Sequence, residues 1–349
     1  MTVTVEVSER EFLPDTVPLA TWWRQTTPGT FYWRCLIPAR HLPGRVNALH
    51  WDDFALDSGG EPVLHRQAGT AIWQFLGNAT RGLIAAHIQA QGTRVLMEVD
   101  DNYLSPPPRM PGTTSQWTTT LDRSEEDRYS HQAHRRLIEW MDGVIVSTPF
   151  LADLYAQHTQ APIFVCPNSV DPDDWEPVGE RDRNVTVGYA GSDSHRYDLH
   201  LVERALDTAH RAGADLVKLG ATTKQWRWPH HQEPWTNDLD LYRRSLQKID
   251  IGLCPVRRSA WHDGKSDIKA LEYVMAGAIP IVQADSPCYS EWVDLTFSAS
   301  TAKQWDRAVK EALALNPDQR QSMWADLRRH VLLNKTIGSH IHKWREAIR

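Results

Sequence analysis

The sequence of 349 residues predicts an α/β protein built from two doubly wound domains. Short apolar stretches of strand length alternate with stretches of helical periodicity, which favours parallel sheets covered by helices on both faces. The pattern stops at a polar link, DPDDWEPVGERDRN (171–184), and then starts again. At about 150 residues per domain, the length also favours two domains. We therefore expect one domain over 1–170, a second over 171–330 and a final helix over 331–349.

The elements expected in the first domain follow one another in strand–helix order. Apolar runs indicate the strands, and apolar residues three and four apart indicate the helices. Gly92 ends one helix, and Asp100 and Asp101 directly follow the strand TRVLMEV. In chain order we expect a loop running into a helix (30–42), a strand (70–75), a helix (79–91), a strand (93–99), a Pro-, Thr- and Ser-rich stretch (105–120), a helix (123–141), a strand (142–148), a helix (149–157) and a strand (162–170).

The second domain repeats this alternation. Ligands of doubly wound sheets bind outside the carboxyl ends of the strands, which singles out Asp100–Asp101, Gly191–Asp193 and the segment after Val256. The expected elements are a strand (184–191), a helix (194–212), a strand (214–220), an irregular Trp- and His-rich loop (222–237), a helix (239–248), a strand (250–256), a helix (266–276), a strand (278–284), a helix (301–315) and a helical region (317–349).

Composition excludes several classes of protein. With 41% apolar and 23% charged residues, the chain is typical of folded rather than disordered proteins. Residues 1–170 carry 18 acidic and 13 basic side chains, so the overall basic footprint of a nucleic-acid binder is missing. The four cysteines stand far apart without metal-ligand spacing, which indicates free thiols in a reducing cytosol. We expect a cytoplasmic protein with no metal site, no signal peptide and no transmembrane segment.

The most informative stretch is HDGKSDIKALEYVMAGAIPIV (262–282). A helix is expected to begin after Gly264, with Ser266 as its N-cap. Gly277 suits the left-handed position that ends such a helix, and Pro280 lies beyond it.

Three charged residues are expected on one face of this helix. Lys265, Lys269 and Glu272 step by four and three residues, so they share a face. Lys265, Ser266 and the free N–H groups of the helix start suit a phosphate or diphosphate, and Glu272 suits two ribose hydroxyls. A solvated helix face with a Lys–Glu pair is the competing interpretation.

Two further turns lie at carboxyl ends of strands. In VTVGYAGSDSHRYDL (185–199), Gly191, Ser192 and Asp193 form a turn in which a glycine lets the backbone approach a ligand. In VLMEVDDNYL (95–104), Asp100 and Asp101 are placed to act as a base on an acceptor hydroxyl or to orient a sugar. An ordinary strand-to-helix turn and an N-cap with a turn residue are the competing interpretations.

Together these segments resemble glycosyltransferases of the GT-B fold, in the large retaining family of the glycosyl transferases group 1 type. The resemblance covers about residues 30–295 and runs in the right order. It implies two Rossmann-like domains facing a cleft, with the acceptor on the N-terminal domain, the nucleotide-sugar donor on the C-terminal domain and a C-terminal helix that crosses back. The stretches that carry it are EVDDNYL, VIVSTPFLADLY with PIFVCPNSVDPDDW, VGYAGSDSHRYDL, and DIGLCPV with GKSDIKALEYVMAGAIPIV.

The resemblance also implies roles for individual residues. Donor binding would involve Gly191, Ser192, Asp193, Lys265, Ser266, Lys269 and Glu272. The acceptor side would involve Arg34, Asp100 and Asp101, and the candidate catalytic residues are Asp100, Asp101 and Lys265. The chain departs from the family at one position: a carboxylate often stands eight residues before the ribose-binding Glu, where this chain has Gly264.

The expected function is transfer of a hexose from a UDP- or GDP-sugar to an acceptor hydroxyl, with retention and with neither metal nor cofactor. The acceptor stays open among a small molecule, a glycan and a hydroxymethyl-pyrimidine base in DNA. KQWRWPHHQEPW (224–235) has the basic and aromatic mixture that a nucleic-acid strand stacks on, although a loop whose Trp residues cap the core is the favoured interpretation. A nucleotide-sugar epimerase and a non-catalytic nucleotide-sugar binder are alternatives of other classes.

Overall fold

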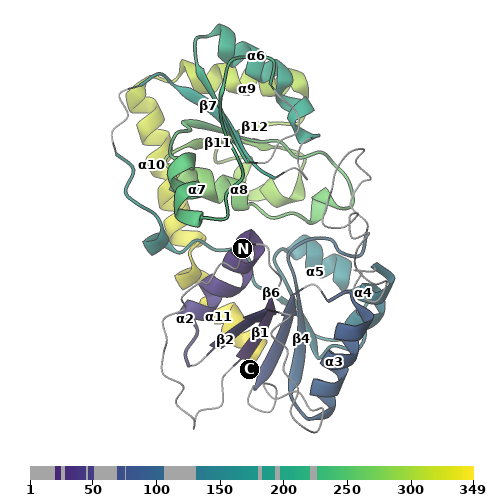
Figure 1. Cartoon of the computed structure of the whole chain (residues 1–349). Helices are drawn as coiled ribbons and strands as arrows, with labels where there is room; N and C mark the ends of the chain where they lie inside the picture. The colour runs from purple at the N-terminus through teal and green to yellow at the C-terminus, as the bar shows by residue number, and fades with distance from the viewer. Residues whose placement is uncertain are drawn as a thin grey trace.

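Among the residues that the structure describes, two six-stranded parallel sheets form the two lobes (Figure 1). In the described part of the chain, every pairing between neighbouring strands is parallel. The α/β fold with two doubly wound sheets is therefore confirmed. The computed structural model describes residues 20–24, 28–44, 46–50, 69–74, 76–105, 131–179, 183–192, 197–220 and 226–349.

The N-terminal sheet has the strand order β2-β1-β3-β4-β5-β6. Strands β1 and β2 fall where the sequence predicts no element, because five residues such as ATWWR or VNALH are too short and too mixed in polarity to show a period. The strands are β1 (Ala20–Arg24), β2 (Val46–His50), β3 (Thr70–Gln74), β4 (Arg94–Val99), β5 (Gly143–Val146) and β6 (Ile163–Val165). The helices are α1 (Pro28–Phe31), the π-helical turn η1 (Tyr32–Leu36), α2 (Ile37–His41), α3 (Ala79–Ala90), α4 (His131–Ile138) and α5 (Pro149–Tyr155).

The C-terminal sheet has the order β12-β11-β10-β7-β8-β9. Its two edge strands were not predicted, because an edge strand pairs on one side only and needs no apolar run. The expectation of an irregular loop over 222–237 is wrong where β9 forms. The strands are β7 (Thr186–Ala190), β8 (Asp215–Leu219), β9 (His231–Glu233), β10 (Ile251–Cys254), β11 (Ile279–Gln283) and β12 (Phe297–Ala299). The helical elements are η5 (Pro172–Asp174) in the link, then η7 (Asp198–Val202), α6 (Glu203–Arg211), α7 (Leu239–Leu246), η8 (His262–Gly264), α8 (Ile268–Met275), η9 (Pro287–Trp292) and α9 (Ala302–Ala314).

Helix α8 begins later than the sequence predicts. Its N-cap is Asp267, not Ser266, and no side chain caps it. The Asp267 carboxylate is instead drawn away from the helix start, because it accepts a hydrogen bond from the Trp292 indole at 2.9 Å. Lys265 consequently precedes the helix in extended backbone and does not share its face with Lys269. The predicted end is confirmed: Gly277 has φ of 92°.

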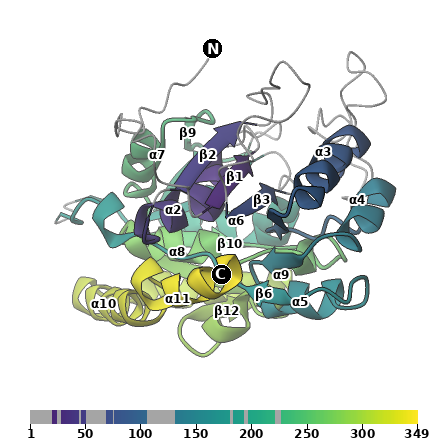
Figure 2. The same cartoon turned by 90° about the horizontal axis from the view of Figure 1, so that it is seen from below.

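The last two helices connect the lobes. Helix α10 (Pro317–Asn334) packs on α8 and β11 in the C-terminal lobe, and α11 (Ile337–Ile348) packs on α2 and β6 in the N-terminal lobe (Figure 2). Trp344 of α11 meets Trp22 of β1 with ring centroids 5.8 Å apart. The predicted crossing back of the C-terminal helix is confirmed, whereas the domain boundaries in the chain stay predictions. None of the described helices, α10 included, is long and apolar enough to cross a membrane.

A buried ion pair connects η1 and β4 in the core of the N-terminal lobe. Arg34 is fully buried, and its Nε lies 2.6 Å from Glu98 Oε1. Its Nη1 donates to the Cys166 carbonyl at 2.6 Å and to Asn168 Oδ1 at 3.2 Å, and its guanidinium covers the Trp344 ring. Arg34, a residue of η1, thus contacts β4, the segment between β6 and η5, and α11.

Replacing Arg34 with alanine should lower the free energy of unfolding by about 3–5 kcal/mol, because the Glu98 carboxylate stays buried without its cation. Arg40 is the matched control. It pairs with Asp174 at 3.0 Å, but its side chain is 45% exposed, and exposed pairs contribute at most about 1 kcal/mol. Chemical denaturation of both alanine variants measures the difference, and equal losses would contradict the role assigned to Arg34.

Candidate functional site

The junction between the lobes is built from segments that follow carboxyl ends of strands (Figure 1). Strand β4 leads into Asp100–Tyr103 in the N-terminal lobe. Strand β10 leads into the segment 255–267 ahead of α8 in the C-terminal lobe. Because ligands of doubly wound sheets bind at these ends, the junction is the candidate site.

An ion pair joins the two lobes here. Lys265 Nζ lies 2.6 Å from Asp101 Oδ2, and the two side chains are only 19% and 17% exposed. Burial raises the pKa of Asp101 to about 7, with the Lys265 ammonium opposing the shift and the Asp100 carboxylate adding to it. Asp100 itself accepts a hydrogen bond from the Tyr103 hydroxyl at 2.7 Å. Two of the three predicted catalytic residues are therefore in direct contact, and they come from different lobes.

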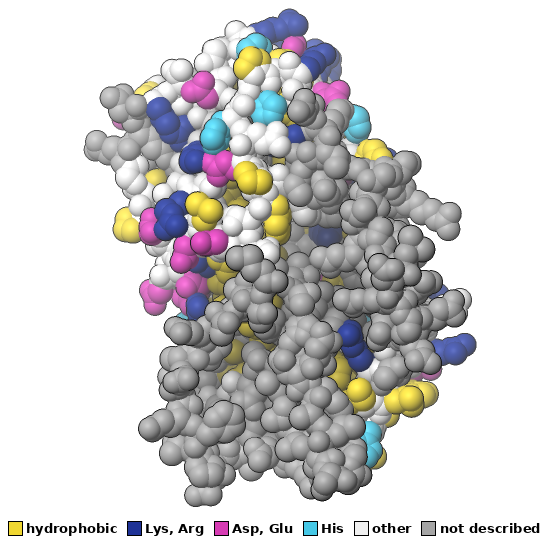
Figure 3. Space-filling model, in the orientation of Figure 1, with side chains coloured by type: hydrophobic (Ala, Val, Ile, Leu, Met, Phe, Trp, Pro, Cys, Tyr) yellow, Lys and Arg dark blue, Asp and Glu magenta, His cyan; other side chains and the backbone are white. Residues whose placement is uncertain are grey.

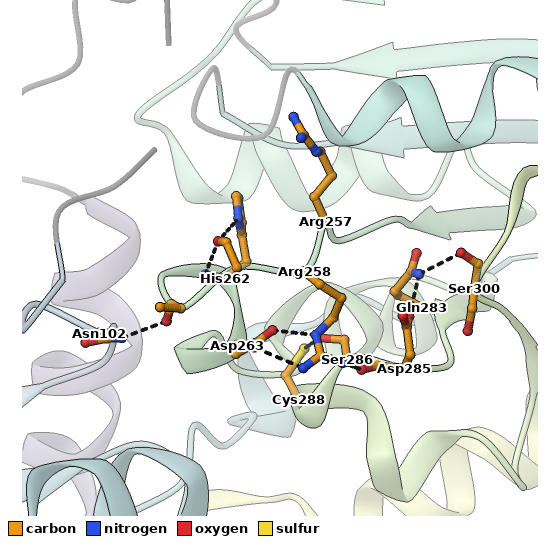
Figure 4. Close-up of polar contacts among 12 residues, drawn as sticks. Asn102, Arg257, Arg258, His262, Asp263, Gln283, Asp285, Ser286, Cys288 and Ser300 are labelled. Atoms are coloured by element: carbon orange, nitrogen blue, oxygen red, sulfur yellow. Dashed lines mark hydrogen bonds and ion pairs between the residues drawn. The ribbon is translucent and has the colours of Figure 1, made fainter. Parts of the chain in front are cut away.

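Gly264 lies against the backbone of the opposite lobe. A Cβ at this position would be 2.8 Å from the Asn102 Cβ and 2.9 Å from the Asn102 nitrogen, which is too close for packing. The Asn102 amide donates to the Ala260 carbonyl at 2.6 Å (Figure 4), and the Tyr103 ring meets Trp261 edge to face. The space that a side chain at position 264 would need is taken by Asn102, so a carboxylate has no room there.

The segment between β10 and α8 is braced from within. Arg258 donates to Asp263 at 2.7 and 3.0 Å and to the Asp285 carbonyl (Figure 4). The neighbouring Arg257 is exposed and points away from these groups. This bracing fixes the backbone that presents Lys265.

Sequence reasoning missed a buried imidazole of this segment, His262, and a buried carboxylate next to it, Asp198. Asp198 Oδ1 accepts from the Arg257 backbone N–H at 3.0 Å, and Asp198 Oδ2 lies 4.0 Å from His262 Nε2. The other ring nitrogen of His262 is 2.8 Å from Ser259 Oγ. Burial lowers the pKa of His262. No local pattern pairs Asp198 with His262, because the contact joins segments far apart in the chain.

The turn after β7 meets α8 at Lys269. Lys269 Nζ lies 3.3 Å from the Tyr189 hydroxyl oxygen and 4.3 Å from the centroid of that ring. A Cβ on Gly191 would be 3.0 Å from the same Nζ and closer still to the Tyr189 hydroxyl, so only glycine fits. Burial lowers the pKa of Lys269. Ser192 lies in this turn, whereas the predicted donor-binding residue Asp193 lies outside the described residues.

Glu272 lies further along α8, beside a cavity of about 290 Å³. Tyr242 lines this cavity and donates to Glu272 Oε2 at 2.9 Å. Trp235 and Leu241 line it too. Burial raises the pKa of Glu272 to about 7, against the opposing effects of the Tyr242 hydrogen bond and the Lys269 charge. Sequence reasoning missed Tyr242 and Trp235, because aromatic residues at such positions are equally typical of a core.

Ser266 and Arg34 are both hydrogen-bonded to Asn168, on opposite sides of its amide group. The Asn168 amide donates to Ser266 Oγ at 2.7 Å and accepts from Arg34. Arg34 is enclosed by groups of the chain itself, which favours a structural role over contact with an acceptor. Its predicted place on the acceptor side stays a prediction.

The aromatic residues of the segment 226–235 serve mainly for packing. Trp226 and Trp228 are buried in the core of the C-terminal lobe, and the exposed Trp235 lines the cavity beside Glu272. On the face of this lobe that Figure 3 shows, acidic and basic side chains of the described residues are interspersed. Within the described residues, two of the three tryptophans that a nucleic-acid strand would stack on are therefore unavailable for stacking.

The two facing lobes and the returning C-terminal helix define a GT-B fold, as predicted. No protein-family model matches the sequence, and neither does any curated protein sequence.

Solved structures of similar fold come from glycosyltransferases. An alpha,alpha-trehalose-phosphate synthase (UDP-forming) from Burkholderia vietnamiensis matches with a TM-score of 0.54 and 13% identity over 82% of this chain and 77% of that chain. The catalytic domain of starch synthase IV from Arabidopsis thaliana, bound to ADP and acarbose, matches with a TM-score of 0.53 and 12% identity over 83% and 73%. TarM from S. aureus, in a complex that includes UDP, matches with 0.56 and 12% over 81% and 56%. At these identities the likeness establishes the fold.

Replacing Gly264 with alanine should destabilise the protein by about 1–3 kcal/mol, because the added Cβ pushes against the Asn102 backbone and forces the lobes apart. Gly179 is the matched control, since a Cβ there meets no atom within 4 Å. Thermal unfolding of both alanine variants measures the effect. A Gly264→Ala protein as stable as Gly179→Ala would show that the lobes do not touch at this point in solution.

Proposed function

We propose that this protein is a glycosyltransferase that moves a hexose from a nucleoside diphosphate sugar, a UDP- or GDP-sugar, to an acceptor hydroxyl. One observation carries the proposal. Within a GT-B fold, Lys265 and Lys269 bring two cationic groups to the carboxyl edge of the C-terminal sheet, and Lys265 directly faces Asp101 of the other lobe. Cations on one side of a junction and a carboxylate on the other suit a leaving diphosphate and an attacking hydroxyl.

The lysines stabilise the leaving group. Breaking the anomeric C–O bond gives the sugar oxocarbenium character and builds negative charge on the diphosphate. Lys265 and Lys269 balance that charge at fixed positions, so little reorganisation is needed during the reaction. Because Gly191 has no side chain, the turn after β7 lies directly against Lys269 Nζ. These two cations support a mechanism in which no metal is required.

Asp101 acts on the acceptor. A carboxylate with a pKa near 7 is matched to taking a proton at neutral pH. In the absence of donor it pairs with Lys265, and a bound diphosphate competes for the same ammonium, which leaves Asp101 facing the acceptor hydroxyl. Asp100 orients the Tyr103 hydroxyl beside it. Retention of the anomeric configuration is part of the proposal and rests on the resemblance to the retaining family.

Glu272 and the adjoining cavity hold the nucleoside. The carboxylate accepts hydrogen bonds from ribose hydroxyls, and Tyr242 holds it in place from the side of the cavity. The cavity offers apolar and aromatic walls for a base, including Trp235 and Leu241. Trp235 is therefore a further candidate for contact with the base.

The test is a donor screen. UDP, GDP, ADP and TDP are titrated calorimetrically into the protein, and nucleotide release from the matching sugar nucleotides is followed with and without candidate acceptors: sugars, glycans and hydroxymethylated DNA. Acceptor-dependent release of one nucleotide is expected. Turnover of the donor without acceptor would indicate an epimerase, and binding without product a non-catalytic binder. Binding of none of the four nucleotides would overturn the proposal.

Lys265→Ala should lower kcat by roughly 10²–10³-fold and weaken donor binding much less, because charge on the leaving group grows in the transition state. Lys310→Ala is the control, since Lys310 is an exposed lysine of α9 paired with Asp306. Steady-state kinetics of both variants with the donor from the screen separate kcat from KM. An equal loss in kcat for both variants, or a loss confined to KM, would count against this role.

Donor affinity should rise as the pH increases through about 7. The raised pKa of Glu272 leaves it partly protonated at neutral pH, and the ribose hydroxyls need the ionised form as acceptor. Glu272→Gln should bind more weakly and lose this part of the pH dependence. Calorimetric titration with a sugar nucleotide at pH 6, 7 and 8 provides the measurement. An unchanged pH profile in the variant would assign the ribose contact elsewhere.

A further inference from the structure

Asn168 is buried in the segment between β6 and η5, with 2% of its surface exposed. Both ends of its amide are engaged. The oxygen accepts from Arg34 Nη1 at 3.2 Å, and the nitrogen donates to Ser266 Oγ at 2.7 Å. Through the Asn168 side chain alone, this segment contacts both the core of the N-terminal lobe and the start of α8 in the C-terminal lobe.

The chemistry of Arg34 decides which way this amide faces. A guanidinium has only donors, so the Asn168 oxygen must face it and the NH₂ group must face Ser266. Arg34 cannot turn away, because Glu98 and the Cys166 carbonyl hold it and Trp344 covers it. The positive charge on Arg34 also polarises the amide, which strengthens the hydrogen bond that its NH₂ group donates.

This arrangement decides what the Ser266 hydroxyl is able to do. A hydroxyl has one hydrogen to donate, and here its oxygen already accepts from Asn168. Among the residues that the structure describes, none accepts that hydrogen. Ser266 directly follows Lys265 and precedes the N-cap of α8, where the first backbone N–H groups of the helix lie. The hydrogen is therefore available to an acceptor beside a cation and a helix start.

We propose that Asn168 is a positioning residue that makes the Ser266 hydroxyl a hydrogen-bond donor to the diphosphate of the nucleotide-sugar substrate. The inference rests on the proposed function, because it takes the diphosphate as the ligand of Lys265. A diphosphate offers acceptors only, so a hydroxyl that is held as a donor recognises it, whereas one free to rotate does so less well. The N-terminal lobe thereby acts on the donor site through Glu98, Arg34, Asn168 and Ser266 in turn.

The test replaces Asn168 with aspartate. The new carboxylate keeps the contact with Arg34, so the fold is retained, but it accepts the Ser266 hydrogen and turns the hydroxyl away from phosphate. Affinity for the preferred nucleoside diphosphate, measured by calorimetry, should fall about tenfold or more, while affinity for the nucleoside without phosphate stays unchanged. Ser266→Ala should show a similar loss, and Ser266→Thr, which keeps the hydroxyl, should stay near wild type.

A double variant separates this effect from simple charge repulsion by the new carboxylate. If Asn168 acts through Ser266, adding Asn168→Asp to Ser266→Ala costs little further affinity. An equal loss in both backgrounds would overturn the proposal, as would unchanged affinity in Asn168→Asp. Should Asn168→Asp fail to fold, equal affinities of Ser266→Ala and wild type would overturn it. Failure of the proposed function is distinct, because the wild-type protein would then bind none of the nucleoside diphosphates.

Discussion

The arrangement of the lobes rests on the hydrogen bonds that the buried guanidinium of Arg34 makes. Three hydrogen bonds hold this buried cation, because its Nε donates to Glu98 and its Nη1 donates to the Cys166 carbonyl and to Asn168. Glu98 lies on β4, and Cys166 and Asn168 lie in the segment between β6 and η5. The ring of Trp344, a residue of α11, covers the guanidinium. The Arg34 side chain thereby fixes the positions of the sheet, of the segment after β6 and of the returning helix relative to one another.

The candidate site is divided between the lobes, and neither half is complete alone. The C-terminal lobe contributes the lysines and Glu272, and the N-terminal lobe contributes Asp101. The ion pair between Lys265 and Asp101 connects the two halves. The same contact has two effects. It pairs the largely buried charges of Lys265 and Asp101, and it keeps the proposed base, Asp101, next to the proposed diphosphate site. A substrate that takes over Lys265 therefore changes the electrostatic surroundings of Asp101 directly.

Gly264 explains how the lobes come so close. Where the resembling family often carries a carboxylate, this chain has no side chain, and the Asn102 backbone fills the space. Asn102 then bonds to the Ala260 carbonyl, so the contact is both packed and hydrogen-bonded. The substitution is thus matched by its surroundings in the opposite lobe. The carboxylate that pairs with Lys265 of the proposed diphosphate site is Asp101, which belongs to the other lobe.

Features that depend on local properties of the chain were predictable from its residues alone. Periodicity located most strands and helices, and Gly277 marked the end of α8. The rule that ligands bind at carboxyl ends of strands singled out Asp101 and the segment that contains Lys265, each in its own domain. Periodicity missed the short strands β1, β2, β9 and β12, whose pairing partners and not their own residues stabilise them. Long-range packing, in contrast, encloses Arg34 in the core and decided that Ser266 bonds to Asn168 instead of capping its helix. It also decided that Asp198 meets His262. Each of these contacts joins segments far apart in the chain, and their energy comes from burial and charge pairing that no local pattern encodes.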